Sequence, residues 1–227
     1  MHREIAIPLW EDRLASRLRG FGPLGIFAIV CIFYATWYAP PLAFLMVLVW
    51  GRLSRTPWRE IGFARPKSWT RDLAIGLVLG CALKLVLKAV VMPLLGADPI
   101  NHAYHYVVGN RAAIPGILLT ILLAGVGEET VFRGYLFERM SKLFGLGVAA
   151  RALMVLLTSV WFGMNHFVLM GWVGFENAAI AGLVFGAIYA ATRQLWLLIV
   201  AHIAADSLAF AIIYWNLENT VAHWIFK

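Results

Sequence analysis

The stretch AAIPGILLTILLAGVGEETVFRGYLFERM, residues 112–140, sets two glutamates and an arginine directly after a continuously apolar run. The apolar part, residues 112–126, is typical of a helix inside a lipid bilayer. Glu128, Glu129 and Arg133 follow it within the same span, where ionisable side chains are costly and usually mark a function. The stretch therefore indicates a membrane helix that carries functional groups.

The composition of the whole chain indicates a polytopic membrane protein. Hydrophobic residues make up 62% of its 227 residues and charged residues 14%, whereas soluble globular domains are roughly 45–50% apolar and about 25% charged. Runs such as residues 21–50 and 73–97 meet or exceed the roughly 20 residues needed to cross a bilayer. The runs do not alternate as barrel strands would, so the sequence predicts an all-α transmembrane helical bundle.

Basic residues set the orientation of the predicted spans, which number about seven. The loop at residues 52–71 and the N-terminus are both rich in Arg, and both should face the cytoplasm. Residues 21–53 should therefore enter and return as a hairpin, broken at the Ala39-Pro40-Pro41 turn. The other spans are expected at residues 73–95, 112–140, 148–166, 172–190 and 195–215.

The chain divides into two unequal parts. Residues 1–20 have no apolar core for a cleaved signal, and we expect a cytoplasmic tail or an interfacial helix with Ile5, Leu9, Leu14 and Leu18 on its apolar face. Residues 21–227 should form a single integral-membrane domain. The formal charge of +7 comes from cytoplasmic loops, so no nucleic-acid partner is expected. Cys31 and Cys81 lie inside apolar spans and suggest neither a disulfide nor a metal site.

Three clusters of polar residues interrupt the apolar spans. Glu129 and Arg133 are four apart on a helix and should form an ion pair, while Glu128 lies about 100° round the helix and is free to act elsewhere. The second cluster is Asn165 with His166. In the third, His202 and Asp206 are again four apart, so the aspartate can orient the imidazole.

Two chemistries need this set of residues. A carboxylate with two imidazoles can activate water for amide hydrolysis, either through zinc or directly with the histidines stabilising the oxyanion. Alternatively, buried Glu, His and Asp can relay protons in a transporter. The sequence holds neither H-E-x-x-H nor G-x-S-x-G, which argues against two other protease designs.

At these residues the chain resembles the CPBP family, the CAAX prenyl endopeptidases and bacteriocin-processing enzymes also called the Abi family of intramembrane proteases. The family signature is Glu-Glu-x-x-x-Arg, then Phe-x-x-x-His, then His-x-x-x-Asn or Asp. Here these motifs read EETVFR at 128–133, FGMNH at 162–166 and HIAAD at 202–206. Their order is that of the family, and each lies in its own predicted span. The resemblance places the motif-bearing protease core at residues 113–210.

The resemblance also implies roles for these residues. Glu128 would be the general base for the attacking water, with Glu129 and Arg133 supporting it. His166 and His202 would stabilise the oxyanion or, together with Glu128, bind zinc, and Asp206 takes the place of the family's Asn or Asp. A metal-free enzyme and a zinc enzyme both stay open, with the metal-free form preferred because a clear set of three zinc ligands is absent.

The resemblance implies a peptide or protein substrate, membrane-anchored or lipidated, for a multi-pass protein of the bacterial cytoplasmic membrane surrounded by lipid. Two alternatives remain: a non-proteolytic member of the family that acts in bacteriocin self-immunity, and a proton-coupled transporter. One expectation works against the protease. Straight spans would hold Glu128 near mid-membrane, His166 toward the outer end and His202 toward the inner third, so a tilt or a broken helix would have to bring them together.

Overall fold

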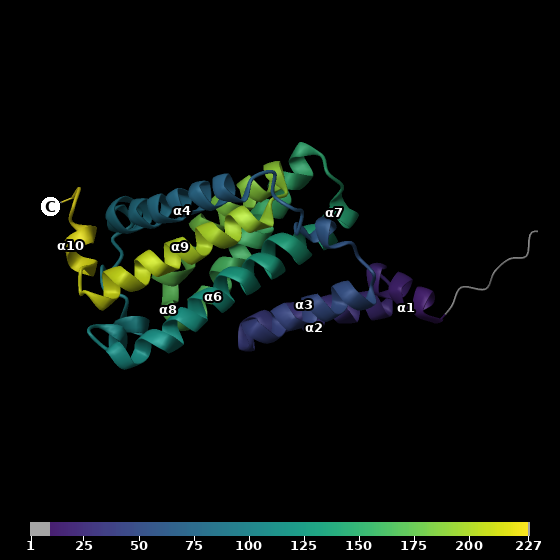
Figure 1. Ribbon diagram of the computed structural model, residues 1–227, viewed down its shortest axis with the longest axis horizontal. Coiled ribbons are helices and arrows are strands. Elements are labelled where there is room, and N and C mark those ends of the chain that lie inside the picture. The colour runs from purple at the N-terminus through teal and green to yellow at the C-terminus, as the bar shows by residue number, and fades with distance from the viewer. Residues whose placement is uncertain (1–9, 227) are drawn as a thin grey trace, which may run out of the picture.

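The computed structural model describes residues 10–226, and within them every regular element is helical, as Figure 1 shows. The predicted all-α class is therefore confirmed. The α-helices are α1 (Trp10–Arg19), α2 (Pro23–Tyr38), α3 (Pro40–Leu53), α4 (Trp69–Val86), α5 (Met92–Leu94), α6 (Ile114–Glu129), α7 (Leu136–Phe144), α8 (Val148–Thr192), α9 (Leu195–Tyr214) and α10 (Glu218–Ala222). The 3-10 helices are η1 (Trp58–Ile61), η3 (His102–Val107) and η4 (Arg111–Ala113), and the π-helical segments are η2 (Leu87–Val91) and η5 (Thr130–Tyr135).

Four helical stretches are long and apolar enough to cross a membrane, or five if the bent pair α1 and α2 counts as one span. The stretches 69–94 and 111–144 each run through a π-helical segment without a break. The predicted count of about seven spans is approximate for two reasons. The hairpin helices α2 and α3 have only 16 and 14 residues, and α8 joins two predicted spans.

Helix α8 is a hairpin folded at Gly171. This residue has φ 62° and ψ −153°, a combination that glycine adopts and other residues avoid. The two halves then run back along each other, since a Cβ on Gly182 would stand 3.0 Å from the Cα of Ser159 and one on Gly186 would stand 3.2 Å from Val155. The predicted spans 148–166 and 172–190 correspond to these halves.

The N-terminal helices form a separate hairpin against this bundle. Helix α2 ends at Tyr38, and α3 begins with Pro40, whose missing N–H is tolerated in the first helical turn. Helix α1 packs on both through its buried Ala15 and Leu18. Ile5 and Leu9, expected on an interfacial helix, lie outside the described residues.

Helix α9 occupies the centre of the bundle and packs against α4 on one side and α6 on the other (Figure 1). Small residues allow the approach: a Cβ on Gly80 of α4 would stand 2.0 Å from the carbonyl oxygen of Ala201. On α6, a Cβ on Gly125 would stand 2.5 Å from Ile203. These contacts fix how far α4 and α6 slide along α9, and with that they fix which side chains meet.

Candidate active site

The end of α6 carries a buried ion pair. Arg133 Nη1 donates to Glu129 Oε1 at 2.9 Å, and the side chains are only 1% and 0% exposed. The guanidinium also lies over the ring of Phe162, 4.7 Å from its centroid. The pairing expected from the spacing of four residues is therefore present, and aromatic packing keeps it away from solvent.

Glu129 also joins α6 to α9. Its Oε1 lies 2.7 Å from His202 Nδ1, so the same oxygen serves both Arg133 and His202. A carboxylate can only accept, which fixes Nδ1 as the protonated nitrogen of this contact. The contact turns Nε2 of His202 toward two other carboxylates, Asp206 Oδ2 at 3.4 Å and Glu128 Oε2 at 3.7 Å.

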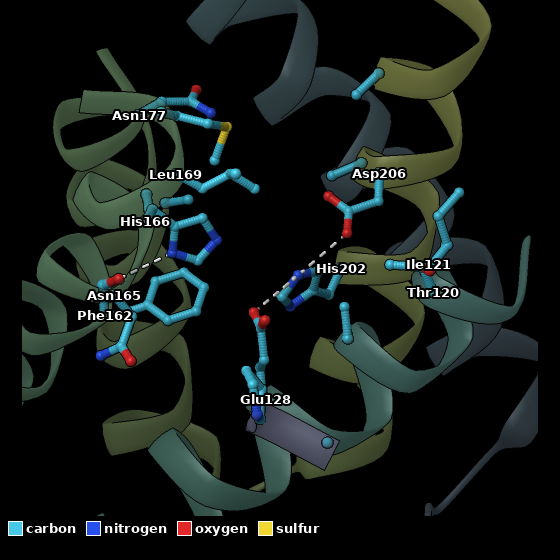
Figure 2. Close-up of a pocket in the computed structure, with 18 of the residues that line it drawn as sticks. Thr120, Ile121, Glu128, Phe162, Asn165, His166, Leu169, Asn177, His202 and Asp206 are labelled. Carbon is cyan, nitrogen blue, oxygen red and sulfur yellow. Dashed lines mark hydrogen bonds and ion pairs between the residues drawn. The ribbon is translucent and has the colours of Figure 1, made fainter. Parts of the chain in front are cut away.

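Glu128 points away from this buried pair into open space. Its side chain is 18% exposed, and Oε2 has no hydrogen-bond partner among the described residues. Figure 2 shows the carboxylate rising between His166 on one side and His202 with Asp206 on the other. The two adjacent glutamates therefore have separate environments, as their 100° offset on a helix requires.

His166 lies on the opposite wall, on the first half of α8. Its Nδ1 is 2.9 Å from the carbonyl oxygen of Phe162, and a carbonyl can only accept, so Nδ1 carries the proton. The Phe162 ring packs edge-on against the imidazole at 4.6 Å. Since Nδ1 is engaged, the other nitrogen, Nε2, remains for chemistry in the cavity that Figure 2 shows between His166 and Glu128.

These residues line one cavity of about 520 Å³. Its walls come from α4, α6, both halves of α8, α9, the tips of α2 and α3, and the loop before α6. The cavity holds Glu128, His166, His202 and Asp206 together. Asp206 is the most open of the ion-pair partners in this group, with its side chain 39% exposed.

The expectation that straight spans keep these residues at different depths is wrong, and the turn at Gly171 gives the reason. The turn begins soon after His166, and its Met170 sulfur lies 3.7 Å from Asn101 Nδ2 in the loop before α6. The chain reverses at Gly171, and the second half of α8 runs back along the first. Figure 2 shows His166 facing Glu128 as a result.

Several cavity residues were not expected from the sequence. Tyr104 lies in η3, in the loop before α6, and it lines the cavity. Burial, with the negative charges of Asp206 and Glu128 nearby, raises the pKa of the Tyr104 hydroxyl. Thr36 and Trp37 line it from the N-terminal hairpin. No local pattern marks these residues, because only the packing of distant segments brings them to the cavity.

The donor atoms do not form a ready metal site. In residues 10–226, no three His, Cys, Asp or Glu side chains are grouped so that they could hold a metal ion. Both histidines use Nδ1 in a hydrogen bond, which leaves Nε2 as the nitrogen that could bind a metal ion. The sequence left a zinc site of His166, His202 and Glu128 open beside the preferred metal-free form, and that preference stays a prediction.

The comparison with family models gives one match. Residues 110–208 match the family described as type II CAAX prenyl endopeptidase, Rce1-like. This segment contains all three motifs, and with them Glu128, Glu129, Arg133, His166, His202 and Asp206. No curated protein and no solved structure matches the chain.

Proposed function

We propose that the chain is an intramembrane endopeptidase of the CPBP family, and the match of residues 110–208 to the Rce1-like family supports this. Its substrate is a peptide bond in a membrane-associated or lipid-modified protein or peptide. The observation that carries the proposal is the Glu128 carboxylate, which stands in a cavity between two imidazoles inside the membrane bundle.

Glu128 is the general base in this proposal. One carboxylate oxygen takes a proton from a water molecule as the water oxygen adds to the scissile carbonyl carbon. The tetrahedral intermediate then collapses, and the proton held by Glu128 passes to the departing amine nitrogen as the C–N bond breaks. The position of Oε2 supports this role, because this oxygen accepts no hydrogen bond from another described residue and lies 3.7 Å from His202 Nε2, the proposed oxyanion donor.

His202 supplies the charge that stabilises the oxyanion. With Nδ1–H held by Glu129, His202 can donate through Nε2 only as an imidazolium. The surrounding carboxylates support that form. The 3.4 Å separation from Asp206 Oδ2 exceeds an ordinary N–H···O hydrogen bond of about 2.7–3.2 Å. Nε2–H is therefore available to a substrate oxygen.

His166 has a different role from His202. Its Nδ1–H donates to the Phe162 carbonyl, so Nε2 of the neutral ring is an acceptor and not a donor. We assign it to orient the attacking water by accepting one of the water's hydrogen bonds while Glu128 accepts the other. The sequence analysis gave both imidazoles the same role, to stabilise the oxyanion or bind metal. In this proposal His202 stabilises the oxyanion and His166 orients the water.

The proposal takes the metal-free form. Its support is the donor arrangement, in which the histidine and carboxylate groups are not gathered as three metal ligands in the described part of the chain. Glu129 and Arg133 serve as positioning residues, because they fix the His202 ring without reaching the cavity. Asp206 lies beside Nε2 of His202, the nitrogen that faces the substrate in this proposal.

We further propose that the partners are the peptide substrate and the surrounding lipid. The family description names a prenyl endopeptidase, which supports a lipidated or membrane-anchored substrate. The bacterial cytoplasmic membrane is the proposed location, with the Arg-rich segment 52–71 on the cytoplasmic side.

The test is Glu128→Gln in purified, detergent-solubilised protein, assayed with a fluorogenic farnesylated CAAX peptide and its unprenylated twin. We expect kcat to fall about 10²- to 10⁴-fold, the usual contribution of a general base. Glu176→Gln is the matched control. Glu176 lies on the second half of α8, does not line the cavity and forms no ion pair with another described residue, so this variant should keep wild-type turnover. Equal turnover by wild type and Glu128→Gln would remove Glu128 from the mechanism.

A further inference from the structure

Lys84 lies on the cavity wall beside the proposed active site. Helices α4 and α9 run in the same direction, because Gly76 faces Val200 and Gly80 faces Ala201 and Ala204. One helical turn further along α4, Lys84 therefore comes level with Asp206 on α9. Both residues line the cavity, and so does Ala205 of α9.

The Lys84 ammonium is not engaged by the protein. Among residues 10–226, it has neither a hydrogen bond nor an ion pair. Asp206 and Glu218 are the acidic groups whose charges act on it, but neither lies within ion-pair distance. A cation at a cavity wall inside a membrane protein is expensive, and such residues typically bind a substrate or an ion.

Lys88, four residues further along the same helical stretch and within η2, shows the opposite behaviour. Its ammonium donates to the carbonyl oxygen of Pro99 and lies 3.4 Å from Glu218 Oε1. Glu218 also accepts from the backbone N–H of Asn101 at 2.9 Å. Lys88 therefore fastens the loop before α6 to α10, and it does not line the cavity. The two lysines share one helix face, but Lys88 has a structural partner whereas Lys84 faces the open cavity.

We propose that Lys84 binds a carboxylate of the substrate and so determines which peptides are accepted. The proposal rests on the endopeptidase function above and extends it to specificity. Lys84 is level with Asp206, one turn beyond His202, which corresponds to about 6 Å along the bundle. An extended peptide advances about 3.3 Å per residue, so the carboxylate lies about two residues from the bond that is cleaved.

Two sources can supply a carboxylate at that distance. One is the free C-terminus of a substrate cleaved close to its end, and the other is an acidic side chain. Either would pair with the Lys84 ammonium, whereas a neutral amide in the same place would leave the cation unpaired. Charge-assisted hydrogen bonds are the stronger class, so the preference for a charged group should be large enough to measure.

The experiment measures binding, in the Glu128→Gln background so that bound peptide stays intact. The probes are three dansylated farnesyl-cysteine tetrapeptides: one with a free C-terminal carboxylate, its C-terminal amide, and the amide with aspartate as the last residue. Fluorescence titration should show the free acid or the aspartate peptide binding about ten- to a hundredfold more tightly than the plain amide. Whichever of the two shows the preference identifies the source of the carboxylate.

Lys84→Met should bring the acid-to-amide ratio close to one, and Lys84→Arg should retain most of the preference. Lys88→Met is the control, and it should keep the wild-type ratio because its ammonium is already bound within the protein. Wild-type chromatographic elution and unfolding temperature show that each variant is folded. An unchanged ratio in Lys84→Met, no preference in the starting protein, or equal loss in Lys88→Met would overturn the proposal.

The same measurements separate this proposal from the endopeptidase function. Binding is read without cleavage, and turnover of the free acid by wild-type protein is read separately. Absent turnover with a preserved carboxylate preference would contradict the endopeptidase and keep the Lys84 site. Normal turnover without any preference would contradict the Lys84 site and keep the endopeptidase.

Discussion

At the scale of single residues, the two adjacent glutamates have different roles: one forms the buried ion pair and the other extends into the cavity. Glu129 is fully buried and holds Arg133 and His202 with one oxygen. Glu128 extends into the cavity, with its side chain 18% exposed. An offset of about 100° between neighbours on a helix is enough to send one side chain into the core and the other into the cavity.

Glu129→Gln should destabilise the protein, because it leaves the buried Arg133 without its counter-charge. Removing one partner of a buried ion pair lowers the stability by about 3–5 kcal/mol. The His202 ring would also lose its charged acceptor. The measurement is thermal unfolding in detergent, compared with Glu128→Gln one residue away. Glu128→Gln should unfold close to wild type, since Oε2 accepts no hydrogen bond among residues 10–226 and its 3.7 Å contact with His202 Nε2 is longer than the Glu129 contacts at 2.7 and 2.9 Å. Equal stability of the two variants would contradict a structural role for Glu129.

At the scale of elements, the turn in α8 places His166. Gly171 is the only residue inside α8 with non-helical backbone angles, and the hairpin it allows packs through Gly163 and Gly182. Without the turn, the residues after His166 would continue past the cavity. The position of an imidazole in the site therefore depends on a glycine five residues away.

Gly171→Ala tests this dependence. A Cβ there would meet nothing within 4 Å, so the cost is backbone strain at φ 62°, about 1–3 kcal/mol. We expect a lower unfolding temperature and reduced turnover. Gly116→Ala is the control: its Cβ also meets nothing, its φ is not positive, and it lies in the first turn of α6. That variant should be as stable as wild type or up to about 1 kcal/mol more stable. A Gly171→Ala protein as stable as its control would show that the turn tolerates other residues.

At the scale of the whole molecule, the cavity is built by segments from nearly the full length of the described chain. Helices α4, α6 and α9 supply one side, the α8 hairpin supplies the other, and the α2 and α3 tips close it. The aromatic and aliphatic clusters on both sides of Arg133 hold these segments together. The proposed activation of water needs such a cavity, because a lone polar helix would expose its charges to lipid.

Chelation tests the metal-free mechanism for the assembled enzyme. EDTA treatment followed by gel filtration should leave kcat/KM unchanged, since the proposed base and oxyanion donor are the Glu128 and His202 side chains themselves. The measurement is turnover of the farnesylated peptide before and after chelation, with added zinc as the second arm. Loss of activity that zinc restores would replace the direct mechanism with a metal-dependent one.

The helical class and the local pairs could be predicted from the sequence because both depend on short-range geometry. Long apolar runs specify membrane helices, and a spacing of four residues places Glu129 beside Arg133 and His202 beside Asp206. Of the site residues named from the motifs, Glu128, His166, His202 and Asp206 line one cavity, whereas Glu129 and Arg133 are buried outside it. Their catalytic roles remain predictions.

The depth at which the helices meet was decided by the tertiary structure. Close contacts at Gly80 and Gly125 set how α4 and α6 lie along α9, and the reversal at Gly171 brings His166 opposite Glu128. The 2.7 Å contact between Glu129 and His202 joins residues far apart in the chain. Periodicity describes a helix about its own axis, whereas tilt, sliding and reversal depend on the surfaces of neighbouring helices, so only the packed molecule determines them.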